Sequence, residues 1–341
     1  MDGMQTAAPL VISLGDPCGI GPEIVARAWQ ALRAEPGLAF CVIGGAATLE
    51  KQGVTVARVA AVGQTASVFP AALPVLDRPL DASAIPGRPD AVHAPHIIDW
   101  IATGVALCQA GEARALVTAP IAKAVLYETG FAFPGHTEYL AELCRDGETV
   151  ATPVMMLTAP DPANAGELRV VLATIHMPLA EVPAALDPAH LAAIGRITAQ
   201  ALQRDFGIAT PRLVMAGLNP HAGESGTIGR EEIDILAPAV GQLCSEGIDI
   251  RGPFPADSLF HEAARRTYDA VLCMYHDQGL IPLKTLDFWG GVNITLGLPV
   301  VRTSPDHGTG FDIAGQGVAR ADSLINAIRA ADAISRRRTK P

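Results

Sequence analysis

The sequence has few charged residues, few aromatic residues and no long uninterrupted apolar segment. Charged residues make up 18% and aromatic residues 5% of the 341 residues, whereas 49% are hydrophobic. No segment reaches the roughly 18 apolar residues of a membrane span, and the N-terminal stretch "MDGMQTAAPLVISLG" lacks the basic start of a secretion signal. We therefore expect a cytoplasmic globular protein without a membrane segment.

Positive charge and paired cysteines are also scarce. The formal net charge of -10 argues against a nucleic-acid partner, because such binding neutralises phosphates. The six cysteines form no C-x-x-C pair, which predicts buried thiols in a reducing compartment. There is no internal repeat, no G-x-G-x-x-G motif and no Walker A motif, so the sequence predicts neither a Rossmann fingerprint nor a P-loop.

What the sequence does contain is an alternation of short apolar segments with longer amphipathic ones. This alternation predicts an α/β fold with largely parallel sheets flanked by helices. A length of 341 residues favours two domains. We interpret residues 71–90, rich in proline and polar residues, as a long surface connection. The predicted strands are "PLVISLG", "LAFCVIG", "ARALVTAP", "LRVVLATIH", "PRLVMAGLN" and "DAVLCMYH".

Three histidines each stand where a predicted strand ends. His176 follows "VVLATI", His221 follows "LVMAGLNP" and His276 follows "AVLCMY". Because ligands gather at the carboxyl ends of parallel strands, the three imidazoles can meet at one edge, an arrangement typical of a catalytic zinc site. Any one of them alone is explained as well by a hydrogen bond to backbone. Asp277 either supports His276 or caps the following helix.

The turn "LGDPCGIGPEI" is a candidate anion-binding element. Gly15, Gly19 and Gly21 would let backbone N–H groups approach a ligand at the start of a helix. A tight turn without any ligand explains the same glycines.

Isolated polar groups later in the chain are candidates for recognising a carboxylate or phosphate. Lys284, Asn293 and Arg302 lie in a stretch with little charge. Strand-edge cations that improve solubility are the alternative. His136 and Thr137 precede a predicted helix and are either a hydrogen-bonding pair for a ligand or a turn residue and an N-cap.

Two classes of function fit these residues. One is a metal-dependent enzyme acting on a small anionic substrate between two lobes, and the other is a binding protein for a phosphorylated metabolite. The separated histidines favour the enzyme, because binding an anion needs no Lewis acid.

Seven stretches together closely resemble the 4-hydroxythreonine-4-phosphate dehydrogenase family of vitamin B6 biosynthesis, over almost the whole chain. They are "GDPCGIGPEI", "PGHTEYLAE", "TIHMPL", "LNPHAGE", "GPFPADSLF", "YHDQGLIPLK" and "GVNITLGLPVVRTSPDHGTGFDIAGQGVA". The family is related to the isocitrate and isopropylmalate dehydrogenases. The resemblance implies two α/β/α domains with a cleft between them: residues 1–130 plus 303–341 on the cofactor side, and residues 131–302 with the metal, the substrate and the dimer interface.

The resemblance also implies an activity and a set of site residues. The activity is oxidation of 4-phosphooxy-L-threonine by NAD or NADP, followed by decarboxylation, in a homodimer with a shared active site. The implied metal ligands are His176, His221 and His276, with zinc expected and magnesium or cobalt as alternatives. The implied substrate residues are His136, Thr137, Lys284, Asn293 and Arg302. The implied cofactor residues are Gly15, Asp16, Gly19, Gly21, His307, Gly308 and Asp312.

The general base and the substrate stay open at this point. Lys284, Asp257 and Asp277 are the candidates for the base. Cys18 and the stretch "SGTIGR" depart from the family pattern. Relatives in the same superfamily act on D-threonate or D-erythronate 4-phosphate and on aromatic cis-dihydrodiols.

Overall fold

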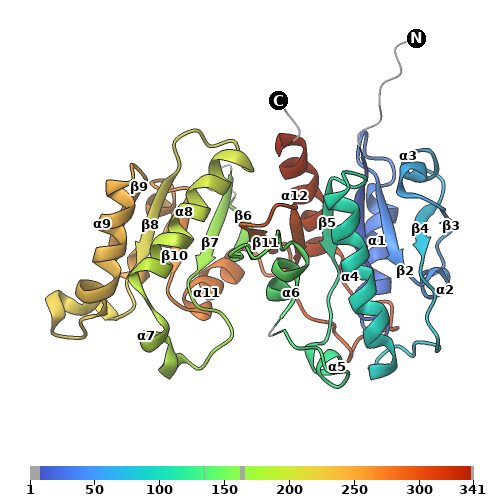
Figure 1. The fold of residues 1–341 in the computed structure, drawn as a ribbon, viewed down its shortest axis with the longest axis horizontal. Helices are drawn as coiled ribbons and strands as arrows, with labels where there is room; N and C mark the ends of the chain where they lie inside the picture. Colours follow the sequence, from blue (N-terminus) through green and yellow to red (C-terminus); the bar gives the residue numbers. More distant parts are fainter. Residues whose placement is uncertain (1–7, 134, 162–165, 339–341) are drawn as a thin grey trace, which may run out of the picture. The chain divides into compact units, whose positions relative to one another are not determined.

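The computed structural model describes residues 8–133, 135–161 and 166–338, which form two compact α/β units (Figure 1). Of these residues, those up to 153 and residues 298–336 form the first unit, and residues 154–297 with 337–338 form the second. These boundaries differ from the predicted 131 and 302. Residues 131–133 and 135–153 belong to the first unit because α6 (His136–Leu143) contacts α4 (Ala94–Gln109). Residues 298–302 also belong there, and the carbonyl of Val301 accepts a hydrogen bond from Leu116 N at 3.0 Å.

The strands of the first unit form a parallel sheet in the order β3-β4-β2-β1-β5-β12. Strands β1 and β2 are buried along their whole length, as expected where helices cover both faces. The strands are β1 (Leu10–Ser13), β2 (Phe40–Gly44), β3 (Val56–Arg58), β4 (Leu73–Asp77), β5 (Ala115–Thr118) and β12 (Arg302–Pro305). The helices are α1 (Gly21–Leu32), α2 (Ala46–Glu50), α3 (Thr65–Val68), α4, α5 (Lys123–Tyr127), α6 and α12 (Asp322–Arg338).

The interpretation of residues 71–90 as a surface connection is wrong at its start. Leu73–Asp77 form strand β4, which pairs in parallel with both β2 and β3. Leu73 and Val75 are fully buried. Burial of these apolar side chains stabilises the strand, although the neighbouring prolines cannot donate backbone hydrogen bonds to the sheet.

Helix α4 is the most apolar long helix of the first unit. The segment Ala91–Gln109 is long and apolar enough to cross a membrane by length and composition alone. In the structure it packs against β1, β2 and β5, and Ile97, Trp100 and Ile101 are buried there. Its position is that of a core helix in an α/β sheet.

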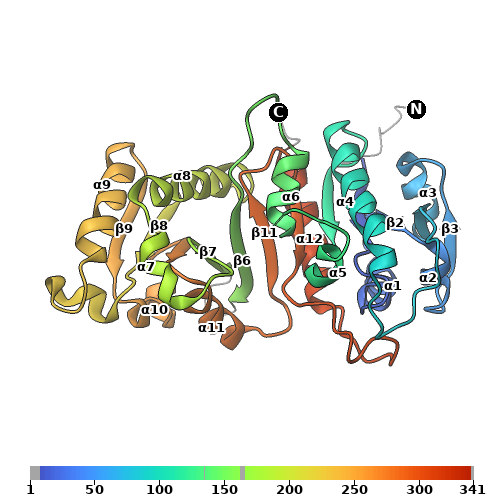
Figure 2. The same cartoon turned by 60° about the horizontal axis from the view of Figure 1, so that its bottom comes forward.

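The second unit contains a mixed sheet in the order β11-β6-β7-β10-β8-β9 (Figure 1). Figure 2 shows the same strands turned, with β6 beside β11. Strand β6 runs antiparallel to both β11 and β7, whereas β7, β10, β8 and β9 are parallel to one another. The strands are β6 (Val154–Asp161), β7 (Gly166–Leu172), β8 (Arg212–Ala216), β9 (Asp249–Phe254), β10 (Ala270–Cys273) and β11 (Val292–Leu296). The helices are α7 (Val182–Ala185), α8 (Pro188–Arg204), α9 (Ala237–Ser245), α10 (Glu262–Arg265) and α11 (His276–Leu286).

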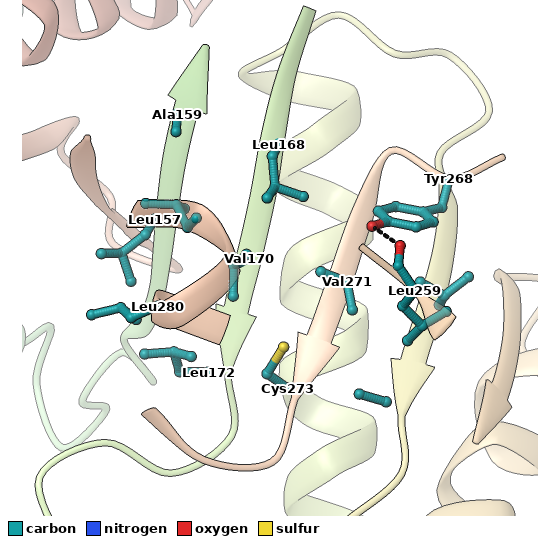
Figure 3. Packing of buried hydrophobic residues seen from close by; sticks show 13 residues of the cluster. Leu157, Ala159, Leu168, Val170, Leu172, Leu259, Tyr268, Val271, Cys273 and Leu280 are labelled. Atoms are coloured by element: carbon teal, nitrogen blue, oxygen red, sulfur yellow. Dashed lines mark hydrogen bonds between the residues drawn. The ribbon is translucent and has the colours of Figure 1, made fainter. Parts of the chain in front are cut away.

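The core of the second unit lies between this sheet and α11. Leu168, Val170 and Leu172 of β7 pack there with Leu280 of α11 (Figure 3). The backbone of α11 approaches closely at Gly279, where an added Cβ would lie 2.2 Å from Cγ1 of Val170. Helix α11 is therefore fixed against the parallel strands that carry the predicted metal ligands.

Candidate active site

The three predicted metal-binding histidines follow three adjacent parallel strands. Strand β10 pairs with β7 on one side and with β8 on the other. His176 follows β7, His221 follows β8 and His276 begins α11 directly after β10. The chain therefore leaves the sheet at one edge in all three places, as the sequence predicted.

Two of these histidines lie close together within one chain. The ring centroids of His176 and His276 are 5.9 Å apart, and both rings line a surface pocket of about 640 Å³. Over the residues that the structure describes, no three His, Cys, Asp or Glu side chains come near enough to form a metal site. One chain therefore brings together two of the three predicted ligands, and His221 does not complete a set with them.

In two of the histidines, a carboxylate lies within hydrogen-bond distance of the Nδ1 atom. The Nδ1 atom of His276 lies 2.7 Å from Oδ1 of Asp277, and the Nδ1 atom of His221 lies 3.0 Å from Oε2 of Glu224. When Nδ1–H donates to a carboxylate, the lone pair of Nε2 is left for a metal ion. Imidazole donors of this kind suit a divalent cation, although the described part of one chain does not bring three ligands together. Asp277 supports His276 from the first turn of α11, and Glu224 is a partner that the sequence did not predict.

His221 begins a short left-handed segment. The four non-glycine residues between His221 and Ser225 have φ values from 45° to 57°, a conformation that L-residues rarely adopt. The segment is anchored by buried Glu232, which accepts from Asn219 N at 2.7 Å and from Asn219 Nδ2 at 2.9 Å. Such strain persists only where the surrounding structure enforces it, and it gathers at functional sites.

A cationic cluster lies at the end of β5 in the first unit. The buried Arg302 donates from Nη2 to Thr118 Oγ1 at 2.7 Å, and the same nitrogen lies 3.5 Å from Nδ1 of His136. A guanidinium only donates, so Nδ1 of His136 accepts and the ring is neutral with its proton on Nε2. Burial lowers the pKa of Arg302 to about 10, so the group stays charged at neutral pH.

The surroundings of His136 favour its neutral ring, which can donate a hydrogen bond, over the charged ring. Burial, followed by the nearby charges of Arg302 and Lys123, holds the pKa of His136 well below its ordinary value. Its Nε2 atom is buried and has no hydrogen-bond partner among the described residues. A buried donor of this kind is typical of a site that a ligand completes.

Lys123 and Thr137 lie around the start of α6. A Cβ added at Gly135 would lie 3.0 Å from Nζ of Lys123. Gly135 is the N-cap of α6, so Thr137 is not the N-cap considered from the sequence but a buried residue of the first turn. Thr118 and Lys123 were not predicted from the sequence. Both follow the "ALV" of β5, so their place after a strand was the signal that pointed to them.

The glycine turn packs against the C-terminal loop that was predicted to bind the cofactor. Ile20 N donates to the carbonyl of Thr309 at 2.8 Å. An added Cβ at Gly19 would lie 2.7 Å from that carbonyl oxygen, and one at Gly21 would lie 2.5 Å from the carbonyl oxygen of Leu14. These two glycines are therefore explained by close packing of the chain, which favours the alternative of a tight turn.

Gly15 and Asp16 occupy the start of the same turn. Gly15 has a φ of 73°, and a Cβ there would lie 2.4 Å from the carbonyl oxygen of Pro120. Asp16 is buried and accepts from Cys18 N at 2.9 Å through Oδ1. Its Oδ2 atom is buried without a partner in the described part of the chain, and burial raises the pKa of the carboxyl group. The neighbouring loop presents His307, Gly308 and Asp312 at the surface.

The remaining predicted residues lie in the second unit. Asn293 is on β11, and its buried Oδ1 has no hydrogen-bond partner among the residues described. Lys284 is on α11, with Nζ 5.3 Å from the ring centroid of Phe288. Asp257 is exposed in a 3-10 turn at Ala256–Ser258.

Comparisons with known proteins show the family of the chain. Residues 38–331 match the family described as pyridoxal phosphate biosynthetic protein PdxA. The 4-hydroxythreonine-4-phosphate dehydrogenase of Caulobacter vibrioides is 59% identical over 338 residues, which cover 98% of this chain and 99% of that protein. The enzyme of the same name from Maricaulis maris is 52% identical, with 96% and 98% covered.

A solved structure shows the same fold. The crystal structure of 4-hydroxythreonine-4-phosphate dehydrogenase from Klebsiella pneumoniae matches with a TM-score of 0.83 and 36% identity, over 96% of this chain and 99% of that one. A family match over most of the chain, full-length relatives and a shared fold lead to one conclusion. The chain belongs to the PdxA family of pyridoxal phosphate biosynthetic proteins, and it is an oxidoreductase.

Proposed function

We propose that this enzyme oxidises 4-phosphooxy-L-threonine at C3 with NAD or NADP and then releases carbon dioxide to form 3-amino-2-oxopropyl phosphate. The relatives' shared name supports the substrate, and a dehydrogenase implies a nicotinamide cofactor. The observation that carries the chemistry is the set of histidines on three adjacent strand ends, two of them with a carboxylate on Nδ1.

The reaction balances in two steps. In the first, the C3 hydride passes to the nicotinamide ring and the hydroxyl proton passes to a base, which leaves a ketone. In the second, the β-keto acid loses its carboxylate as carbon dioxide, and the carbon that carried it takes up a proton. Lys284, Asp257 and Asp277 are the residues we propose to test as the base.

The chain's own groups bind and orient this substrate. Arg302 supplies a desolvated positive charge, and the Nε2 proton of His136 supplies a neutral donor, for the phosphate or carboxylate of the substrate. Thr118 orients Arg302 through its hydroxyl. A divalent cation held by His176, His221 and His276, zinc with magnesium or cobalt as alternatives, would supply positive charge for the oxygen that becomes negative.

The active enzyme is, in this proposal, a cytoplasmic homodimer whose subunits share the active site. Two of the three histidines come together in one chain, which leaves a ligand for a partner subunit to supply. Around the end of α11, the large apolar side chains of Ile281, Phe288 and Trp289 are 64%, 60% and 51% exposed. Apolar side chains gathered at such exposure are typical of a protein interface.

The decisive experiment measures NADH formation with 4-phosphooxy-L-threonine and, in parallel, with D-threonate 4-phosphate and D-erythronate 4-phosphate. The assay is run with NAD and with NADP, before and after chelation and metal add-back. The second candidate substrate class is included because the stretch "SGTIGR" departs from the family pattern. This stretch begins at Ser225, the last non-glycine residue of the left-handed segment. NADH formation with D-threonate 4-phosphate but not with 4-phosphooxy-L-threonine would show that the proposed substrate is wrong. Tight phosphometabolite binding without any NADH would identify a binding protein.

A further inference from the structure

The side chain of Gln278 joins two of the strand ends that carry the predicted metal ligands. It is 9% exposed and stands in the first turn of α11. Its Oε1 atom accepts from Met274 N at 2.7 Å, and its Nε2 atom donates to the carbonyl of Gly217 at 2.6 Å. One amide therefore connects the end of β10 to the residue after β8.

The third strand end is attached to the same peptide. Thr174 donates from its hydroxyl to the carbonyl of Met274 at 2.7 Å, and Ala173 N donates to the carbonyl of Cys273 at 2.8 Å. A chain of hydrogen bonds thus runs from Gly217 through Gln278 and Met274 to Thr174. Each linked segment leads within a few residues to His221, His276 or His176.

An amide is the side chain that these two bonds require. One atom must accept while the other donates. Glutamine does both, whereas glutamate lacks the donor and methionine has no donor and only a weakly accepting sulfur. Helix α11 cannot shift closer to the sheet to relieve a mismatch, because its backbone at Gly279 already lies against Val170 of β7. A lost or repelled partner would therefore shift the strand ends relative to one another.

We propose that Gln278 is a positioning residue that holds in place the strand ends from which the chain presents His176, His221 and His276, by bridging Met274 N and Gly217 O. This inference rests on the proposed function, because it assumes that the histidines bind a metal ion. It extends that proposal by naming a side chain that acts on the ligands without touching the metal or the substrate. Residues that orient metal ligands typically change affinity by about 10–100-fold when altered.

The test compares Gln278→Glu and Gln278→Met with a matched control in the same core. The control, Tyr268→Phe, removes the buried hydrogen bond from the tyrosine hydroxyl to the carbonyl of Leu259 at 2.8 Å (Figure 3). Neither Tyr268 nor Leu259 belongs to the chain of hydrogen bonds between Gly217 and Thr174. For each full-length variant, the zinc dissociation constant is measured by competition with a chromophoric chelator, and Tm is measured by calorimetry.

We expect both Gln278 variants to lose about tenfold or more in zinc affinity, while Tyr268→Phe stays within about twofold of wild type despite a lower Tm. Thr174→Val removes the link at the other end of the chain and should weaken zinc binding in the same direction. It keeps the test available if the Gln278 variants do not fold. Unchanged zinc affinity in the folded variants, with loss in His176→Ala, would overturn the role of Gln278 alone. A folded wild-type protein that binds no zinc, magnesium or cobalt would overturn this inference and the proposed metal site together.

Discussion

The imidazole rings of His176 and His276 lie 5.9 Å apart at an angle of 42°, although they follow different strands of the sheet. Because β7 and β10 are adjacent and parallel, the segments that follow them leave the sheet at the same end. Both rings belong to the proposed set of metal ligands, and this relationship leads to the first prediction.

Replacing His176, His221 or His276 by alanine should remove the bound metal and lower kcat/KM by at least about a hundredfold, because the positive charge opposite the reacting oxygen is lost. Metal content is measured by mass spectrometry of the purified protein, alongside the rate of NADH formation. His190→Ala is the control, since this exposed histidine lies in α8 outside the predicted set. Full activity after verified metal removal would contradict the prediction.

Arg302→Ala and Lys284→Ala should each lower kcat/KM by the equivalent of about 2–5 kcal/mol, because each removes a charged hydrogen bond to the anionic substrate. Arg302→Lys should recover only part of the loss, since an ammonium does not reproduce the planar guanidinium that reaches Thr118. Arg320→Ala, at an exposed ion pair with Asp322, is the control. Variants that fold normally and keep the wild-type kcat/KM would exclude both residues from the site.

Mixed dimers should show which histidine the partner subunit supplies. Inactive His→Ala variants of positions 176, 221 and 276 are co-expressed in all three pairwise combinations. If one ligand comes from the partner, the two combinations that include it should recover activity, because a hybrid dimer then contains one intact site. Random mixing makes roughly half the dimers hybrid, so recovery should approach about a quarter of wild type.

The close approach of His176 and His276 within one chain makes their own combination the most informative of the three. Recovery in that combination would show that the two rings serve different sites in the dimer. If no combination recovers while native mass spectrometry confirms hybrid dimers, all three histidines act within one chain and the shared site is wrong.

The stability of the protein should fall with acidification in a way that depends on His136. The pKa of His136 is lowered in the folded state, so its contribution is complete above the unfolded value of about 6.5 and is lost as the pH falls toward the folded value. His136→Asn should therefore show a smaller loss in the free energy of unfolding between about pH 7 and about pH 5.

His93 provides the comparison for this effect. It is buried, and burial lowers its pKa in the same direction, but it lies next to α4, apart from the Arg302 cluster. His93→Asn should also flatten the pH dependence, without changing substrate affinity. Denaturant titrations at each pH measure both effects. An unaltered pH dependence in His136→Asn would show that this ring titrates normally in the folded protein.

Ser225→Gly should stabilise the protein by about 1 kcal/mol, because Ser225 is exposed and has a φ of 57° that glycine adopts without steric cost. The matched control is Ser245→Gly in the last turn of α9, where backbone φ is ordinary and glycine should be destabilising. Urea denaturation midpoints of the two variants should move in opposite directions. A loss of stability in Ser225→Gly would mean that its side chain contributes more than the strain costs.

Much of the fold followed from the pattern of residues. The runs before Gly15, His176 and His276 are apolar because strands covered on both faces must be, so their positions and their parallel arrangement could be predicted. The strands that escaped prediction are short or mixed, as at Val56–Arg58 and Leu73–Asp77, and are stabilised by neighbours distant in sequence. The antiparallel direction of β6 likewise depends on its partners, since a strand's own residues do not encode direction.

The chemical types of the candidate site residues, and their location after strands, were determined by the sequence itself. Only the tertiary structure decided which groups meet: that Arg302 reaches Thr118, that Glu224 reaches His221 through a left-handed turn, and that Gln278 joins two strand ends. The physical reason is that local composition sets what a segment buries, whereas hydrogen bonds between side chains depend on strand order and backbone φ. These emerge only when the whole chain packs.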